Sequence, residues 1–169
     1  MAKWKIERLT RSHQRGAFTS GKPSLDDFIR SLVTQYEKRN LGRTYVAVQA
    51  GEPSVLGYYT LASGAVPFQN LPDPAVKKLP RHPVPVILLA RLAVDQGSQG
   101  QRLGEALLLD ALRRCLEISE ELGSHAVEVE AIDESARAFY RKYGFVALQD
   151  SDLHLYLPLT TIRAVLGAI

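Results

Sequence analysis

The chain has 169 residues, of which 46% are hydrophobic and 23% are charged, a composition typical of a globular protein with an ordinary core. No run reaches the ~18 to 20 apolar residues of a membrane helix, and the opening MAKWKIERLT lacks the apolar centre of a signal peptide. The single cysteine, Cys115, excludes an internal disulfide and is typical of a reducing compartment. We therefore expect one domain over residues 1–169, cytoplasmic and without membrane contact.

The net charge of +3 is distributed unevenly along the chain. Residues 1–91 carry 14 Lys/Arg against 6 Asp/Glu, a balance of +8, whereas residues 92–169 carry 7 against 12, a balance of −5. A basic first half favours a polyanionic partner such as a nucleic acid. An ordinary basic face, or attraction for the phosphates of coenzyme A alone, would produce the same pattern.

In the first half, residues 3–7 alternate between charged and apolar types, which predicts a strand. A helix is predicted to begin with Ser24 as its N-cap and to run to about Asn40. Its apolar face would carry Leu25, Phe28, Ile29, Leu32, Val33 and Tyr36. Residues 43–49 and 55–63 are then predicted to pair as a hairpin.

The centre of the chain combines a strand, a glycine turn and a long helix. Residues 86–94 are almost unbroken apolar sequence, which suits a strand covered on both faces. After the polar turn 95–101, apolar residues follow helical spacing up to a natural stop at Gly123. They are Leu103, Leu107, Leu108, Ala111, Leu112, Cys115, Leu116, Ser119 and Leu122. The N–H groups at such a helix start favour an anion, most usefully a phosphate.

The last third predicts one strand, two short helices and a closing antiparallel pair of strands. Residues 126–131 alternate as a strand, and Asp133 can cap a helix that begins at Glu134. Residues 145–149 and 153–157 are predicted to pair antiparallel, with a final helix turn or two over 160–166. The fold class is therefore α/β, with a mixed, mostly antiparallel sheet flanked by helices.

The segment Gln99-Gly-Gln-Arg-Leu-Gly104 fits neither GxGxxG nor GxxxxGK[ST]. It resembles the Q/R-x-x-G-x-G/A loop with which GNAT-superfamily N-acetyltransferases hold the pyrophosphate of acetyl-CoA. The strand residues 92–94 and the segment Ala138-Phe-Tyr-Arg-Lys-Tyr-Gly-Phe145 resemble that family as well. In one departure from the family loop, Arg102 replaces its first glycine.

This resemblance implies a GNAT-like fold with a splayed central strand pair and acetyl-CoA as acetyl donor, without a metal. It also implies that Tyr140 donates a proton to the coenzyme A thiolate, although Tyr140 would serve equally as a core aromatic beside Phe139. The residues implied to bind the cofactor are Leu92, Ala93, Val94, Gln99, Gly100, Gln101, Arg102, Leu103, Gly104 and Glu105.

One branch of the superfamily is especially similar, namely the tRNA-acetylating toxins of type II toxin–antitoxin systems. The resembling segments are Gly21-Lys-Pro-Ser-Leu-Asp-Asp-Phe28, Gly57-Tyr-Tyr-Thr-Leu-Ala-Ser-Gly64, Pro83-Val-Pro-Val86, Leu89-Ala-Arg-Leu-Ala-Val-Asp95 and Leu155-Tyr-Leu-Pro-Leu-Thr160. This resemblance implies an aminoacyl-tRNA substrate, a ribbon-helix-helix antitoxin as partner and a homodimer.

No general base is evident in the sequence. Glu128 and Glu130 share one strand face, where a solvated face is the simpler reading than a catalytic cleft, and His125 and His154 have no partners at metal-ligand spacing. A lysine amine with a pKa near ~10.4 must lose a proton before attack, whereas an α-amine near ~7.7–8.0 is already partly neutral.

Basic residues would then grip substrate phosphates rather than transfer protons. The candidates are Lys77, Lys78, Arg81 and Arg91, together with the Arg8–Arg15 and Lys38–Arg43 groups. The first three lie in the proline-rich segment 65–85, for which a short helix near 73–79 is expected. Two alternatives stay open: acetylation of a small-molecule or protein amine, and a non-catalytic module that binds acyl-CoA or a partner.

Overall fold

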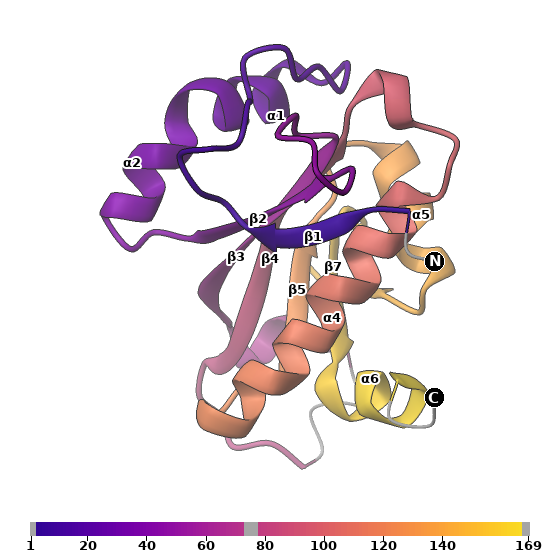
Figure 1. The fold of residues 1–169 in the computed structure, drawn as a ribbon. Helices are drawn as coiled ribbons and strands as arrows, with labels where there is room; N and C mark the ends of the chain where they lie inside the picture. Colours follow the sequence, from indigo (N-terminus) through magenta and orange to yellow (C-terminus); the bar gives the residue numbers. More distant parts are fainter. Residues whose placement is uncertain (1–2, 73–77, 167–169) are drawn as a thin grey trace. The chain divides into compact units, whose positions relative to one another are not determined.

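The computed structural model describes residues 3–72 and 78–166 of the chain. Its strands form one seven-stranded sheet in the order β1-β2-β3-β4-β5-β7-β6 (Figure 1). The chain divides into two compact units, one made of residues 1–62 and 89–111 and the other of residues 63–88 and 112–169. The predicted α/β class with a mixed sheet is confirmed, whereas a splayed strand pair and the extent of the domain stay predictions.

Three long elements contribute residues to both units: β3 (Gly57–Val66), β4 (Val84–Val94) and α4 (Leu103–Glu121). They lie near the positions predicted from the sequence, which were residues 55–63 and 86–94 for the two strands and the helical spacing from Leu103 to Leu122 for the helix. Cys115 on α4 is fully buried, and burial raises the pKa of its thiol to about 12, so the thiol packs as a small apolar group. Within residues 3–72 and 78–166, no helix has the length and apolar character needed to cross a bilayer.

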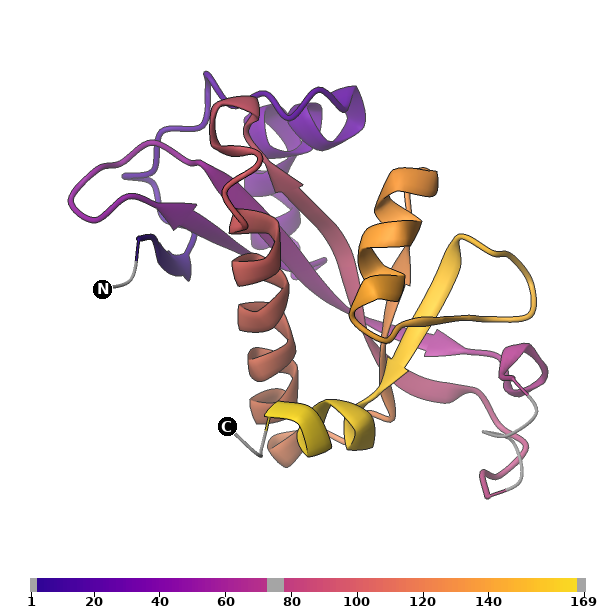
Figure 2. The ribbon, with the colours of Figure 1, turned by 90° about the vertical axis from the view of Figure 1, so that its right-hand side faces the viewer.

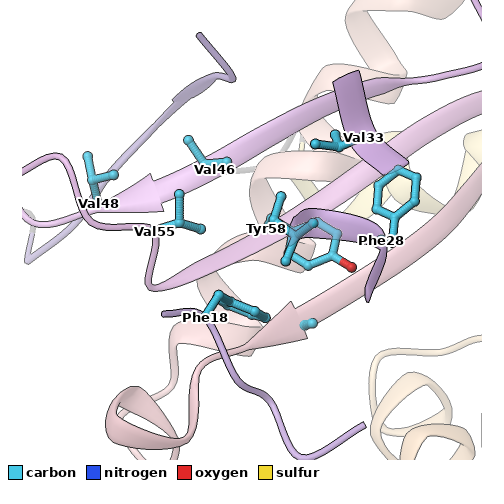
Figure 3. Packing of buried hydrophobic residues seen from close by; sticks show 9 residues of the cluster. Phe18, Phe28, Val33, Val46, Val48, Val55 and Tyr58 are labelled. Carbon is cyan, nitrogen blue, oxygen red and sulfur yellow. The ribbon is translucent and has the colours of Figure 1, made fainter. Parts of the chain in front are cut away.

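The first unit is a hairpin sheet covered by a helical segment. Strand β1 (Lys5–Arg8) pairs antiparallel with β2 (Arg43–Val48), and β2 pairs antiparallel with β3. The helical segment consists of α1 (Pro23–Asp27), η1 (Phe28–Leu32) and α2 (Val33–Lys38). Buried apolar side chains from these elements, from the loops beside them and from β4 form one core (Figure 3): Phe18, Phe28, Ile29, Val33, Val46, Val48, Val55, Tyr58 and Ala93.

Two predictions about this helical segment are wrong. Ser24 is not the N-cap, because Pro23 occupies the first turn and the chain already enters the helix at Lys22. Leu32 is not on the buried face but 42% exposed, because η1 is a π-helix in which the N–H of Val33 reaches back to the carbonyl of Phe28. The wider π turn shifts the helical phase, so a face counted at 3.6 residues per turn fails there.

The second unit is built around the antiparallel pair of β5 (Ala126–Glu130) and β7 (His154–Pro158). The short strand β6 (Val146–Ala147) pairs with β7 on its other side. Helix α6 (Leu159–Leu166) continues from β7 and contacts both β5 and β7 (Figure 2). The 3-10 helix η2 (Phe68–Asn70) leads into an apolar cluster: Val66, Leu71, Val84, Val86, Ala126, Leu148 and Tyr156.

Candidate active site

The turn that follows strand β4 is shaped by its own side chains. Asp95 begins the 3-10 helix η3 (Gln96–Ser98), and its Oδ2 accepts a hydrogen bond from the N–H of Gly97 at 3.0 Å. Gly100 and Arg102 then adopt left-handed backbone conformations, with φ of +80° and +67°. These residues carry the chain from the strand into helix α4.

Arg102 keeps the backbone conformation that a glycine would adopt at this position. The left-handed region costs an L-residue roughly 1–2 kcal/mol, and only glycine enters it freely. The replacement of the family glycine therefore leaves a strained residue within the turn. The side chain of Arg102 is exposed, so its guanidinium points away from the core.

Gln99 ties the turn to two other segments of the first unit. Its side-chain amide donates to the carbonyl of Val94 and to the carbonyl of Ser20, each at 3.0 Å. Beside it, the N–H of Thr19 donates to Oδ1 of Asp95 at 2.9 Å. The loop is thus held from both sides before any ligand arrives, which lowers the ordering cost of binding.

Helix α4 presents unpaired N–H groups at its start. Its first hydrogen bond runs from the N–H of Ala106 to the carbonyl of Arg102 at 3.1 Å, so the N–H groups of Leu103 and Gly104 have no acceptor within the helix. Leu103 is buried and anchors the turn, whereas Gly104 and Glu105 are half-buried and residues 99–102 are exposed. This arrangement suits a phosphate group, because the partial positive charge of the helix end is accessible.

The C-terminal end of β4, residues 92–94, packs closely against strand β3 and helix α4. Ala93 is buried, while Leu92 and Val94 are half-buried. On strand β3, a Cβ at Gly57 would lie 2.8 Å from Leu107 Cδ1 and 3.2 Å from the Ala93 carbonyl oxygen, so any other residue there would displace these neighbours. The binding of the cofactor by residues 92–94 stays a prediction.

Tyr140 lies on helix α5 (Glu134–Lys142) of the second unit, whose start is confirmed: Oδ1 of Asp133 accepts from the N–H of Ala136 at 2.9 Å. The Tyr140 ring is only 6% exposed and packs edge-on against Phe139 and Phe145, with centroids 5.3 and 5.4 Å away.

Burial raises the pKa of Tyr140, so its phenol stays protonated at physiological pH. Among the hydrogen bonds of the described residues, none involves its hydroxyl. A fixed ring with an unused O–H can donate a proton or a hydrogen bond to a ligand.

The reading of Glu128 as part of a solvated face is wrong, whereas Glu130 is exposed as expected. Glu128 is 7% exposed, and its Oε2 lies 3.1 Å from Nε2 of His154. That nitrogen is buried and makes no hydrogen bond of good geometry, so the contact is an ion pair by distance only. On its other side, Nδ1 of His154 lies 3.0 Å from both carboxylate oxygens of Asp150.

Burial lowers the pKa of His154, but the carboxylates of Asp150 and Glu128 outweigh this effect and raise it overall. Sequence reasoning missed this group because its members lie on different strands and loops. The alternation of Glu128 with valines was the available signal. Within the described part of the chain, no three His, Cys, Asp or Glu side chains are arranged to hold a metal ion.

The basic residues predicted to bind substrate divide into three kinds. Some serve the fold: Arg8 and Arg43 pair with Glu37 at 2.7 and 3.5 Å, and Arg15 donates to the carbonyl of Ile29. Others face solvent, namely Lys78 and Arg81, while Lys77 lies outside the described residues together with most of the helix predicted near 73–79. Arg91 is of the third kind, being half-buried against aromatic rings.

The turn after β4 and the accessible start of α4 suit the phosphates of a coenzyme A thioester. The family model described as "Acetyltransferase (GNAT) domain" matches residues 40–147, more than half of the chain. The chain belongs to the GNAT acetyltransferases, and it is an N-acetyltransferase that depends on acetyl-CoA. The fold and cofactor predicted from the sequence resemblance are thereby confirmed.

Individual relatives cover almost the whole chain. A tRNA-acetylating toxin from Mycobacterium tuberculosis (strain ATCC 25618 / H37Rv) is 39% identical over 160 residues, 95% of each chain. The structure of AtaT complexed with acetyl-methionyl-tRNAfMet has a TM-score of 0.90 at 30% identity, covering 96% of this chain and 99% of that one. The structure of AtaTR bound with AcCoA has a TM-score of 0.85 at 29% identity, covering 98% and 99%.

Proposed function

We propose that this enzyme moves the acetyl group of acetyl-CoA to the α-amino group of aminoacyl-tRNA, and that it acts as a translation-blocking toxin. The observation that carries the proposal is the 39% identity to a tRNA-acetylating toxin along 95% of both chains. The excess of positive charge in residues 1–91 supports a polyanionic substrate.

The chain supplies the parts that the transfer needs. The N–H groups of Leu103 and Gly104, in the turn held by Gln99, bind the pyrophosphate of the donor. The amine nitrogen attacks the thioester carbonyl, and a backbone N–H near Val94 stabilises the oxyanion that develops. The carbon–sulfur bond then breaks, and the Tyr140 hydroxyl gives its proton to the departing thiolate, to be restored by the proton that the amine loses.

An α-amine substrate does not require a carboxylate base, and the exposed Glu130 of strand β5 is not an evident one. The buried Glu128 is already paired with His154. An α-amine has a pKa near ~7.7–8.0, and a neighbouring ester carbonyl lowers it further, so a useful fraction is neutral without a base. Substrate binding and orientation then supply most of the rate enhancement.

The same proposal extends to the partners and to the location. A ribbon-helix-helix antitoxin neutralises the enzyme, two copies of the chain form a homodimer, and the reaction takes place in the cytoplasm, where aminoacyl-tRNA is used. Two solved relatives support the antitoxin: a mutant AtaT toxin bound to the C-terminus of the antitoxin AtaR, and a KacTA–DNA complex.

The test is to incubate the enzyme with radiolabelled acetyl-CoA and either charged or deacylated total tRNA. Label should enter only the charged tRNA, since deacylated tRNA lacks the amine. Equal labelling of both would reject aminoacyl-tRNA as substrate. An enzyme for small amines would label neither, and a non-catalytic module would bind acetyl-CoA without consuming it.

A further inference from the structure

Arg91 of strand β4 is held on an aromatic platform, which we define as Phe28, Tyr36 and Tyr58. Its guanidinium carbon lies 3.8 Å from the ring centroid of Phe28 and 5.2 Å from that of Tyr36. The two rings meet edge to face at 5.1 Å, and Phe28 stacks on Tyr58 at 6.0 Å. The planar cation therefore has a fixed position, as stacking on an aromatic face favours.

The platform itself is rigid. Phe28 and Tyr58 are buried, and the Tyr58 hydroxyl donates to the carbonyl of Leu25 at 2.6 Å. Phe28 is also the first residue of the π-helix η1, a type of turn that is frequent at functional sites. The aromatic side chains thus hold Arg91 at little further entropic cost when a ligand binds.

Arg91 makes no hydrogen bond or ion pair within the part of the chain that the structure describes. Other arginines of the same unit do: Arg15 and Arg30 each donate to a backbone carbonyl at 2.7 Å. Tyr58 cannot serve as an anionic partner, because burial raises the pKa of its phenol and keeps it neutral. The carboxylate of Asp26 is already occupied by the N–H and hydroxyl of Ser20.

The guanidinium nitrogens of Arg91 have no acceptor in the described part of the chain yet are not buried away from solvent, so they are accessible to a ligand. The fork of N–H donors matches the oxygens of a phosphate, which it can bind in a bidentate manner. Building on the proposed function, we infer that Arg91 binds the phosphate that links the last two nucleotides of aminoacyl-tRNA.

The position of Arg91 on strand β4 agrees with this role. Arg91 precedes by three residues Val94, the site proposed for the oxyanion contact, and three strand residues span about 10 Å. This is of the same order as the reach from an α-amino group, through the ester and the terminal ribose, to the 5′ phosphate of that nucleotide. An acidic side chain of an antitoxin is the alternative ligand for the Arg91 guanidinium.

Two minimal substrates isolate the phosphate: 3′-aminoacyl-adenosine, which has none, and the aminoacyl ester of the dinucleotide CpA, which has one. The wild-type enzyme should use the CpA ester with a kcat/KM about 30-fold higher, the effect of one charge-assisted contact. Arg91→Gln should remove this preference by lowering kcat/KM for the CpA ester alone. Arg91→Lys, which keeps the charge without the fork, should retain only about a third of the preference.

Arg113→Gln is the control, because Arg113 is an exposed arginine of helix α4 that lies outside the platform and outside the groups predicted to bind substrate. It should leave the preference unchanged, and acetyl-CoA affinity should be the same in all variants. An equal loss with both esters in Arg91→Gln, or no wild-type preference between them, would overturn the inference. Loss of antitoxin inhibition with an intact CpA preference would assign Arg91 to the antitoxin instead. A wild-type enzyme that fails to acetylate charged tRNA would reject the proposed function itself.

Discussion

The left-handed conformation of Arg102 makes a prediction whose sign differs from that of ordinary glycine substitutions. Arg102→Gly should stabilise the protein, because glycine adopts a φ of +67° without a steric penalty. The relief is roughly 1–2 kcal/mol, the usual cost of the left-handed region for an L-residue. The greater conformational freedom of glycine in the unfolded chain offsets roughly 0.4–1 kcal/mol of this relief. The free energy of unfolding should therefore rise by about 0.5–1 kcal/mol.

Arg102→Ala separates backbone strain from the loss of the side chain. Alanine keeps the Cβ atom and hence the strain, so its free energy of unfolding should match that of the wild type. The difference between the two variants should be about 1 kcal/mol in urea unfolding, or roughly 2–4 °C in Tm for a chain of this length. Acetyl-CoA affinity, measured by calorimetry, then reports separately whether the Arg102 guanidinium contacts a phosphate.

Arg113 supplies the control, because it is an exposed residue within helix α4. There Arg113→Gly should be about 1 kcal/mol less stable than Arg113→Ala, the ordinary helical order. If glycine were less stable than alanine at position 102 as well, the conformation described for Arg102 would be wrong.

Four further variants test other parts of the enzyme. Gly104→Glu adds bulk and negative charge at the start of α4 and should weaken acetyl-CoA binding about tenfold or more, whereas unchanged affinity in calorimetry would remove the loop from the site. Tyr140→Phe should lower turnover about 100-fold with unaltered Tm and acetyl-CoA Kd, and a wild-type rate would leave Tyr140 with a packing role. The pKa of His154 is raised in the folded protein, so the stabilisation by its charged form is fully present below the unfolded pKa of about 6.5 and is lost as the pH rises through the folded pKa. His154→Gln should therefore lower the free energy of unfolding more near pH 5.5 than near pH 9. Equal losses at the two pH values would contradict the ion-pair assignment. Lys78→Glu with Arg81→Glu should raise KM for charged tRNA and flatten the log–log salt dependence by about 1.4, and an unchanged slope would exclude these residues from the interface.

Features set by neighbouring residues could be predicted from the sequence. Hydrophobic periodicity located strand β4 and helix α4, and the Asp133 cap of α5 was predicted because a cap involves residues only three apart. The loop at residues 99–104 resembles the phosphate-binding loop of the family in its residue types, so it can be predicted from the sequence. Its strained residue was noticed as a replaced glycine, although the sequence could not say whether the turn survives the replacement.

Features that depend on distant residues or on an altered helical phase could not be predicted. The π-helix leaves Leu32 exposed instead of buried, and no residue pattern in the sequence predicts such a turn. Glu128 meets His154 only because β5 and β7 pair in one particular register. The sequence indicates Arg91 as a phosphate-binding residue only by its positive charge. Its stacking on Phe28 and Tyr36 follows from the packing of strand β4 against a helical segment that is distant in the sequence.

The most direct test of the central claim identifies the atom that receives the acetyl group. Charged tRNA is incubated with the enzyme and acetyl-CoA, the ester is cleaved by mild base, and the released amino acid is analysed by mass spectrometry. The proposed reaction predicts N-acetylated amino acid from the wild type and far less from Tyr140→Phe at the same time point. Release of the unmodified amino acid, or an acetyl group that stays on the RNA after deacylation, would contradict it.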